Sequence, residues 1–363
     1  PERMEGKRLF VSFQGAESGL AVWLNGKFVG YSEDTFTPSE FELTEFLKEG
    51  ENKLAVQVFK WTASSWCEDQ DFFRFSGLYR DVYLYAIPEL HVRDMKIVAV
   101  PDETLKKAPL EVTLEMMGKE GGKAVFTLSK DGNVIFTEEK DYAQEISCTY
   151  MMENPLLWSA EEPHLYDLTV EIYDAEGKLQ EVIPEKVGFR RFELKDGLML
   201  INGKRIVFKG VNRHEFSSVS GRVVSEAELR KDLMIMKQNN INAIRLSHYP
   251  NTSLIYRLCD EYGFYTIDET NLETHGSWDI AEFTKDFRYT VPHNKMEWLD
   301  MLLDRANSMY QRDKNHPAIV IWSCGNEAFG GKVIYEMSQF FRSVDKNRLV
   351  HYEGLFHDRS YND

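Results

Sequence analysis

The spacing of hydrophobic positions changes twice along the chain. In the first part, residues 1–88, the spacing is typical of β-strands. Residues 9–13, 53–60 and 80–85 form short apolar-rich runs, and residues 21–30 read as a hairpin around Asn25-Gly26. Alternation at period two predicts strands, and Asn-Gly is a strong signal for a tight turn between two strands. Several short strands at regular spacing predict a jelly-roll β-sandwich for residues 1–88.

Residues 89–190 repeat the strand-like pattern with different spacing. Runs at 110–116, 124–128, 134–136 and 166–173 are joined by turn signals such as Gly121-Gly122 and Asp131-Gly132. This pattern predicts an immunoglobulin-like β-sandwich. The segment lacks a Cys–Trp–Cys spacing, so we expect a variant without the central disulfide. The segment has no group of candidate catalytic or ligand-binding residues, and we interpret the domain as a scaffold.

From residue 191 the pattern alternates between strands and helices. Strands are predicted at 206–212, 243–246, 264–269, 318–322 and 349–352, with helices opening at Ser225 and covering 253–262, 297–312 and the stretch after Gly331. Such alternation is typical of a parallel sheet. We expect residues 191–363 to be the first half of a (β/α)₈ TIM barrel, and the chain to be the amino-terminal and middle fragment of a longer polypeptide.

Composition narrows the class of partners. A net charge of −16 argues against nucleic acid or an anionic membrane surface as a partner. No apolar run is long enough to span a bilayer, and no signal peptide opens the chain. The four cysteines are scattered without metal-ligand spacing, which predicts free thiols in a reducing compartment. These features favour the cytoplasm.

Polar side chains follow each of the first four strands of the third domain. They are Asn212, Arg213 and His214; Arg245 and His248; Glu269, Glu273 and His275; and Asn326 and Glu327. The carboxyl ends of barrel strands meet on one face, where active sites lie. Taken singly, each residue has a simpler interpretation: a histidine that only bonds its neighbours, an arginine that only neutralises carboxylates, or a solvated loop glutamate.

The spacing Glu273-x-His275 suggests a metal pair. In an extended segment, residues two apart point to the same side. With Glu327 as a third ligand, this oxygen-rich set would suit Mg²⁺ or Mn²⁺ better than Zn²⁺.

Several ordered motifs resemble the β-galactosidase branch of glycoside hydrolase family 2. In the third domain they are Asn212-Arg-His-Glu215, Arg245-Leu-Ser-His-Tyr-Pro-Asn251, Asp268-Glu-Thr-Asn-Leu-Glu-Thr-His-Gly276, Asn315-His-Pro317 and Trp322-Ser-Cys-Gly-Asn-Glu327. In the first domain they are Trp23-Leu-Asn-Gly26, Pro38-Ser-Glu-Phe41, Gly50-Glu-Asn52 and Glu68-Asp-Gln-Asp71. The resemblance covers nearly the whole chain and is weakest in the second domain.

The resemblance implies retaining hydrolysis of terminal β-galactosides such as lactose. Glu327 matches the general acid/base. Substrate-binding roles are implied for Asn326, His214, His248, Asp71, Arg245 and Glu17. The implied cofactors are Mg²⁺, held by Glu273, His275 and Glu327, and Na⁺, held by Asp71. The implied full-length protein is a homo-oligomer.

Three features qualify the resemblance. The family's nucleophile is a Glu after the seventh barrel strand, outside these residues, and we interpret Glu353 as a local structural carboxylate. Residues 328–331 are Ala-Phe-Gly-Gly instead of Ser-Gly-His-Gly, and Glu17 stands where an Asn is expected. Two alternatives stay open: a sister specificity such as β-glucuronidase, and a non-catalytic carbohydrate-binding or complementing fragment.

Overall fold

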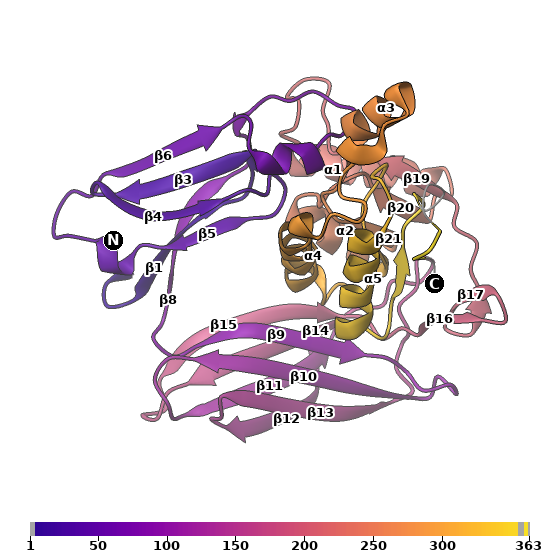
Figure 1. Cartoon of the computed structure of the whole chain (residues 1–363). Helices are drawn as coiled ribbons and strands as arrows, with labels where there is room; N and C mark the ends of the chain where they lie inside the picture. Colours follow the sequence, from indigo (N-terminus) through magenta and orange to yellow (C-terminus); the bar gives the residue numbers. More distant parts are fainter. Residues whose placement is uncertain (1–3, 355–358, 362–363) are drawn as a thin grey trace.

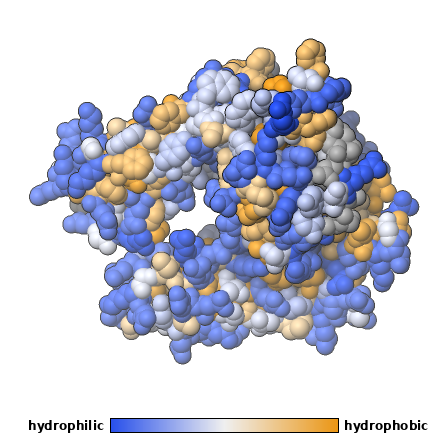
Figure 2. All heavy atoms as spheres, viewed as in Figure 1, coloured by the Kyte–Doolittle hydropathy of each residue, from blue (hydrophilic) through white to orange (hydrophobic). Residues whose placement is uncertain are grey.

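The chain folds into three domains in a computed structural model that describes residues 4–354 and 359–361. Figure 1 shows the first domain at the upper left, the second domain below it, and the third domain at the right, where the yellow end of the chain lies. Figure 2 shows mostly hydrophilic residues on the visible face and an opening between the first and second domains.

The first domain is a β-sandwich. One sheet has the order β5 (Ser39–Glu42), β1 (Arg8–Phe13), β8 (Val82–Ile87), and the other has the order β4 (Lys27–Ser32), β3 (Gly19–Leu24), β6 (Leu54–Phe59). A short pair joins β2 (Ala16–Glu17) and β7 (Gly77–Leu78). The predicted hairpin is confirmed, because β3 and β4 pair around Asn25 and Gly26, which both take positive φ. Inward-facing apolar residues of both sheets form one core.

The second domain is a sandwich of a three-stranded and a four-stranded sheet. The first has the order β13 (Glu145–Glu153), β10 (Lys107–Met117), β9 (His91–Ala99). The second has the order β12 (Asn133–Asp141), β11 (Lys123–Lys130), β14 (Tyr166–Tyr173), β15 (Leu179–Val187). Burial alternates along β10 and β14, as expected for strands with one face on a core. Cys148 is buried and free, so the expectation of a sandwich without a disulfide is confirmed.

The third domain begins with a small antiparallel sheet and continues as half of a barrel. The small sheet joins β16 (Phe192–Lys195), β17 (Leu198–Ile201) and β18 (Lys204–Arg205). The described residues then form a five-stranded parallel sheet of β19 (Gly210–Arg213), β20 (Ala243–Leu246), β21 (Tyr265–Glu269), β22 (Ile319–Ser323) and β23 (Leu349–His351), paired in sequence order. The predicted order of strands is confirmed.

Helices cover the outer face of this sheet. They are α1 (Glu226–Gln238), α2 (Ser253–Tyr262), α4 (Leu299–Asp313) and α5 (Lys332–Val344). The predicted capping box opens α1, since Ser225 and Glu228 exchange side-chain to backbone hydrogen bonds. All five residues of β22 are buried. Its Trp322 stacks on Phe341 of α5 and meets Tyr310 of α4 edge-on. Burial on both faces explains why β22 is a continuous apolar run.

One local prediction is wrong. The segment around Glu273 and His275 was expected to be extended, but His275 is the first residue of a helix, α3 (His275–Thr284). Gly276 and Ser277 weaken the helical pattern in the sequence. The helix is fixed from outside, because the Gly276 amide N–H donates to the Asp69 carboxylate at 2.6 Å. That acceptor belongs to the first domain, so the helix start depends on a tertiary contact.

The first domain reaches the carboxyl ends of the barrel strands through the segment after η3 (Ala63–Cys67). Glu68 and Glu273 form a parallel bridge, with backbone bonds from Asp69 to Glu273 and from Glu273 to Cys67. The four cysteines are buried and free, as predicted. No helix in the described part of the chain is long and apolar enough to cross a bilayer.

Candidate active site

A cavity of about 520 Å³ opens at the carboxyl ends of the barrel strands. It is lined by Asn212, Arg245, His248, His275, Trp278, Asp279, Asn326, Glu327, Glu353 and Gly354. These residues lie in the last part of β19 and β20 or after β20, β21, β22 and β23, so each strand contributes to one site. The volume lies within the range of about 300–1,000 Å³ that is usual for small-molecule sites.

Glu327 projects into this cavity from the turn after β22. Gly325 takes φ 140°, a conformation that suits glycine, and a Cβ there would lie 2.7 Å from the Leu272 carbonyl oxygen. The next residue, Asn326, is buried and its backbone N–H donates to Leu272 at 2.9 Å. The turn leaves the Glu327 side chain 47% exposed, with Oε2 2.8 Å from Nδ1 of His275. The carboxylate therefore meets both solvent and a ring nitrogen.

Three potential metal ligands from two domains meet beside Glu327. Ligand atoms of Asp71, Glu273 and His275 all lie within 4.8 Å of one another. Asp71 comes from the first domain, which the bridge between Glu68 and Glu273 brings to the barrel. The buried Nδ1 of His275 has no hydrogen-bond partner in the described structure, because Glu327 approaches it closely but outside hydrogen-bond geometry. An orphaned nitrogen among carboxylates is a fitting environment for a cation.

The electrostatics of this cluster are unfavourable without a positive charge. Burial, together with the carboxylates of Glu327 and Asp71, raises the pKa of Glu273 to about 7, against the hydrogen bond from Asn326 and the neighbouring His248. Burial by itself would lower the pKa of His275, but Asp279, Glu327, Glu273 and Asp71 raise it above its ordinary value. The raised pKa of His275 reflects the surrounding carboxylates, and that of Glu273 reflects mainly the burial of its own carboxylate.

Glu269, the last residue of β21, organises the opposite side of the cavity. It is fully buried and accepts bonds from Arg245 Nε at 2.7 Å and Ser323 Oγ at 2.7 Å. Its other oxygen lies 2.6 Å from Nδ1 of His248. Arg245 also donates to Asn326 Oδ1 at 3.0 Å, and Asn326 in turn donates to Glu273 at 3.1 Å. One network therefore fixes these predicted site residues together.

His214 lies next to this network without joining it directly. Its ring is 5.2 Å from that of His248, and its Nδ1 is 3.4 Å from the Tyr249 hydroxyl. Burial and the neighbouring His248 lower the pKa of His214, against the carboxylates of Asp71 and Glu269. A neutral imidazole at this position can both donate and accept a hydrogen bond.

The structure does not bring Glu17 to the cavity. Its side chain is 4% exposed, forms an ion pair with Arg222 at 3.3 Å and accepts from the Ser76 amide N–H at 2.6 Å. Arg222 lies 4.0 Å from the ring centre of Phe72, which packs against Tyr249. Glu17 thus lies one layer behind the site, and its predicted contact with sugar stays a prediction.

Sequence reasoning gave no site role to three residues of this region. Glu269 appeared only as one of several polar residues at strand ends, although Asp268-Glu269 closing a strand was a usable signal. Glu353 was interpreted as structural; it lines the cavity and lies 3.5 Å from Arg245. Trp278 lines it as well and offers an aromatic face of the kind that packs on sugars. No signal separated Trp278 from a core tryptophan, because its helix was not predicted.

Comparison with known proteins gives independent evidence on the family to which this chain is related. Models described as the sugar binding domain and the TIM barrel domain of glycosyl hydrolases family 2 match residues 2–88 and 192–363, and a third model, glycosyl hydrolases family 2, matches residues 90–190. A β-galactosidase of Halalkalibacterium halodurans is 52% identical over 99% of this chain and 36% of its own length. One from Clostridium acetobutylicum is 52% identical over 99% and 40%.

Solved structures agree on the fold. A β-glucuronidase of an uncultured Clostridium species has a TM-score of 0.83 at 25% identity, covering 96% of this chain and 60% of that one. A β-glycosidase of Bacteroides vulgatus has a TM-score of 0.81 at 27% identity, covering 96% and 44%. The chain spans between a third and about half of the length of the curated relatives it matches. With all three of its domains matched by models of one family, the chain belongs to glycosyl hydrolase family 2.

Proposed function

We propose that the full-length protein is a retaining β-galactosidase that hydrolyses terminal non-reducing β-D-galactose from β-galactosides such as lactose. Relatives named β-galactosidase are about half identical to this chain over nearly all of it, which supports the proposal. The observation that carries it is the placement of Glu327, half-exposed at the cavity and flanked by His275 and Asn326.

Glu327 acts as general acid and then as general base. Its carboxyl donates a proton to the glycosidic oxygen as the aglycone leaves, and its carboxylate later takes a proton from the incoming water. Retention needs a second carboxylate as nucleophile, roughly 5–5.5 Å from the first. By resemblance to the family, we expect that nucleophile on a later barrel strand, outside these residues. Asn326, His214, His248 and Arg245 bind sugar hydroxyls or support the groups that do.

The carboxylates beside Glu327 are the proposed binding site for Mg²⁺. Glu273 and Glu327 would provide hard oxygen ligands and His275 Nδ1 a nitrogen, with water in the remaining positions. The orphaned Nδ1 and the raised pKa of Glu273 support the assignment, because both conditions are relieved by a cation. When bound, the ion neutralises negative charge next to Glu327. Asp71 is the proposed Na⁺ ligand, and its place within the same cluster makes it a further candidate for the divalent ion.

The described part of the cavity offers no free cation to the carboxylate of a glucuronide, which supports a neutral sugar as the substrate. A sugar carboxylate needs a cation that is free to pair with it. Arg245 is the one lysine or arginine among the described residues that line the cavity, and Glu269 and Glu353 lie 2.7 and 3.5 Å from it. The glucuronidase structures match the fold at low identity, so they carry no argument for that substrate.

The proposal is tested by assaying the full-length protein on nitrophenyl β-galactoside and nitrophenyl β-glucuronide in parallel. We expect kcat/KM to favour the galactoside by at least about a hundredfold, because none of the described lining residues offers a free cation to the glucuronide carboxylate. A preference for the glucuronide would overturn the proposed specificity. Residues 1–363 alone should show little or no hydrolysis. Substantial turnover by them would remove the need for a nucleophile elsewhere.

Two further properties belong to this proposal. Four buried, free cysteines support a reducing location, and we propose the cytoplasm. We also propose that the full-length chain is a homo-oligomer, as the family resemblance implies. Sedimentation of the full-length protein at micromolar concentration measures this state directly, and a monomer would contradict it.

A further inference from the structure

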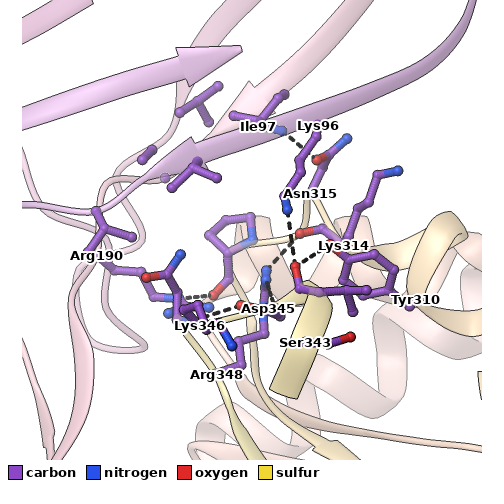
Figure 3. Close-up of a pocket in the computed structure, with 18 residues that line it drawn as sticks. Lys96, Ile97, Arg190, Tyr310, Lys314, Asn315, Ser343, Asp345, Lys346 and Arg348 are labelled. Atoms are coloured by element: carbon purple, nitrogen blue, oxygen red, sulfur yellow. Dashed lines mark hydrogen bonds and ion pairs between the residues drawn. The ribbon is translucent and has the colours of Figure 1, made fainter. Parts of the chain in front are cut away.

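A second cavity, of about 230 Å³, lies at the junction of the second and third domains. Figure 3 shows it between β9 with the β15–β16 connection on one side and α4, α5 and the turn before β23 on the other. It lies at the amino-terminal ends of β22 and β23, whereas the candidate active site lies at the carboxyl ends of the strands. The two cavities share no lining residue, so they are separate sites.

The charges around this cavity oppose the charge of the chain. Although the net charge is −16, the charged residues that line the cavity are five cations and one carboxylate: Lys96, Arg190, Lys314, Lys346, Arg348 and Asp345. Asp345 is paired with Arg348 at 2.7 Å, and Lys314 is paired with Asp94 at 2.5 Å. Three cations therefore have no carboxylate partner among the residues that the structure describes: Lys96, Arg190 and Lys346.

Arg190 lines the cavity and is only 5% exposed. Its Nε donates to the Pro317 carbonyl oxygen at 2.5 Å and its Nη2 to that of Ile319, so part of the guanidinium supports the start of β22. Its Nη1 makes no hydrogen bond to the described residues, yet it is not among their fully buried, unpartnered atoms. The N–H groups of this nitrogen are therefore still available to donate hydrogen bonds to a ligand. Burial and the neighbouring Arg348 lower the pKa of Arg190 to about 9, and a nearby anion would relieve this cost.

Lys96 and Lys346 are further cations that line the cavity, one from each domain. Both are exposed. Lys96 donates to the Val344 carbonyl oxygen at 3.1 Å, and Lys346 donates to that of Arg342. An ammonium carries three donors, so each lysine retains two after this bond. Figure 3 shows Arg190 on the second-domain side and Lys346 and Arg348 on the third-domain side of the cavity.

We propose that this junction cavity binds a small oxyanion of phosphate chemistry, either free phosphate or the phosphate group of a small monoester. A buried guanidinium and two exposed ammonium groups line the cavity from two domains and provide several hydrogen-bond donors, which suits a tetrahedral dianion. The cavity is large enough for phosphate and a short substituent. Because the donors come from two domains, the bound anion would link them, and binding should raise their resistance to unfolding.

The test uses calorimetric titration of the full-length protein with inorganic phosphate and, separately, with a hexose phosphate, with NaCl keeping the ionic strength constant. We expect saturable binding with one anion per chain. The variant Lys96→Ala/Lys346→Ala should weaken it at least about tenfold, since each lysine contributes a charge-assisted hydrogen bond. Tighter binding of the hexose phosphate would identify a monoester as the ligand, and equal binding would identify free phosphate.

A matched control variant distinguishes a specific anion-binding site from nonspecific electrostatic attraction to positive charge. Lys195 and Lys204 are exposed and have no ion pair in the described structure, so Lys195→Ala/Lys204→Ala removes the same charge away from the cavity. It should leave the affinity unchanged. Absence of saturable binding at about 10 mM of either anion, near the weak end of affinities, or an equal loss in the control variant, would overturn the proposal. The readout is binding, so it does not depend on the proposed hydrolysis.

Discussion

Nη2 of Arg305 lies 2.8 Å from Oε1 of Glu68, and both side chains are almost completely buried between α4 and the first domain. The same guanidinium donates from Nη1 to the Asn271 carbonyl oxygen at 2.9 Å. Glu68 in turn accepts from the Asn271 side chain at 2.8 Å and bridges to Glu273. The ion pair therefore joins the first-domain loop that carries Asp71 to the barrel segment that carries Glu273.

Breaking this pair from one side should be costly. Arg305→Met leaves the Glu68 carboxylate buried without its partner, and we expect a loss of about 3–5 kcal/mol in the free energy of unfolding. Urea unfolding measures it. The double variant Arg305→Met/Glu68→Met should be more stable than Arg305→Met, since the buried carboxylate of Glu68 is removed together with its partner. Arg288→Met, at a pair on the surface where Arg288 is 81% exposed, should leave the midpoint unchanged.

Replacing Glu327 tests the proton donor. Glu327→Gln keeps the shape but cannot give or take the proton, so kcat on lactose, whose leaving group is poor, should fall about 10²–10⁴-fold. Nitrophenyl galactoside, whose leaving group needs less protonation, should lose less in the glycosylation step. Glu336→Gln in α5, outside the cavity, is the matched control. An equal loss on both substrates would argue against general acid catalysis by Glu327.

Removing the divalent ion tests the cluster beside Glu327. Chelation should lower the activity of the full-length protein, and Mg²⁺ should restore it. His275→Ala and Glu273→Gln should each weaken Mg²⁺ binding by about 10–100-fold in a calorimetric titration, because each removes a proposed ligand. Glu297→Gln, at an exposed glutamate outside the cavity, should bind Mg²⁺ as the unaltered protein does. Unchanged affinity in both ligand variants would leave Glu273 and His275 with a structural role only.

Glu269 should behave as a positioning residue. Glu269→Gln keeps hydrogen-bonding capacity but removes the negative charge between Arg245 and His248, which lie 2.7 and 2.6 Å away. Since it contacts the groups that bind the sugar, we expect kcat/KM to fall by about tenfold or more while the Mg²⁺ affinity stays constant. Glu269→Asp should recover part of the loss. A drop in Mg²⁺ affinity equal to that of Glu273→Gln would place Glu269 in the metal site instead.

His316 provides a pH-dependent contribution to stability near neutral pH. Its Nδ1 lies 2.6 Å from Oδ2 of Asp260, beside the start of β22. Burial by itself would lower the pKa of His316, but Asp260, Asp313 and Glu185 raise it. A raised pKa means that the folded state binds the proton more tightly. The contribution is therefore complete below the unfolded pKa of about 6.5 and is lost as pH rises through the folded pKa.

The variant His316→Asn retains an N–H donor but no titratable charge. At pH 6 it should be less stable than the unaltered protein by about 1–3 kcal/mol, as for a hydrogen bond to a charged group. The difference should shrink above neutral pH. Thermal unfolding between pH 5.5 and 8.5 measures it, with His164→Asn as a control, because His164 makes no side-chain bond in the described structure. A constant difference across this range would contradict the charged pair.

The sequence by itself determined the order and type of most elements. Period-two runs predicted the strands of the sandwiches, and the apolar stretch of residues 318–322 predicted β22, because a strand buried on both faces has no polar position to interrupt it. It also predicted that Arg245, His248, Glu273 and Glu327 would share one face. That inference needs only the geometry of parallel strands, whose carboxyl ends lie together.

Only the tertiary structure decided how these groups meet. The helix at His275 begins because a first-domain carboxylate, Asp69, accepts from the Gly276 amide, and local sequence cannot register a contact across about 200 positions. The same docking brings Asp71 to Glu273 and leaves Glu17 buried against Arg222. Charge crowding, the pKa of Glu273 and the cationic junction cavity depend on distances between domains. Domain packing sets those distances. Coulomb energies depend on separation and burial and not on position along the chain, so these charge effects cannot be derived from the sequence alone.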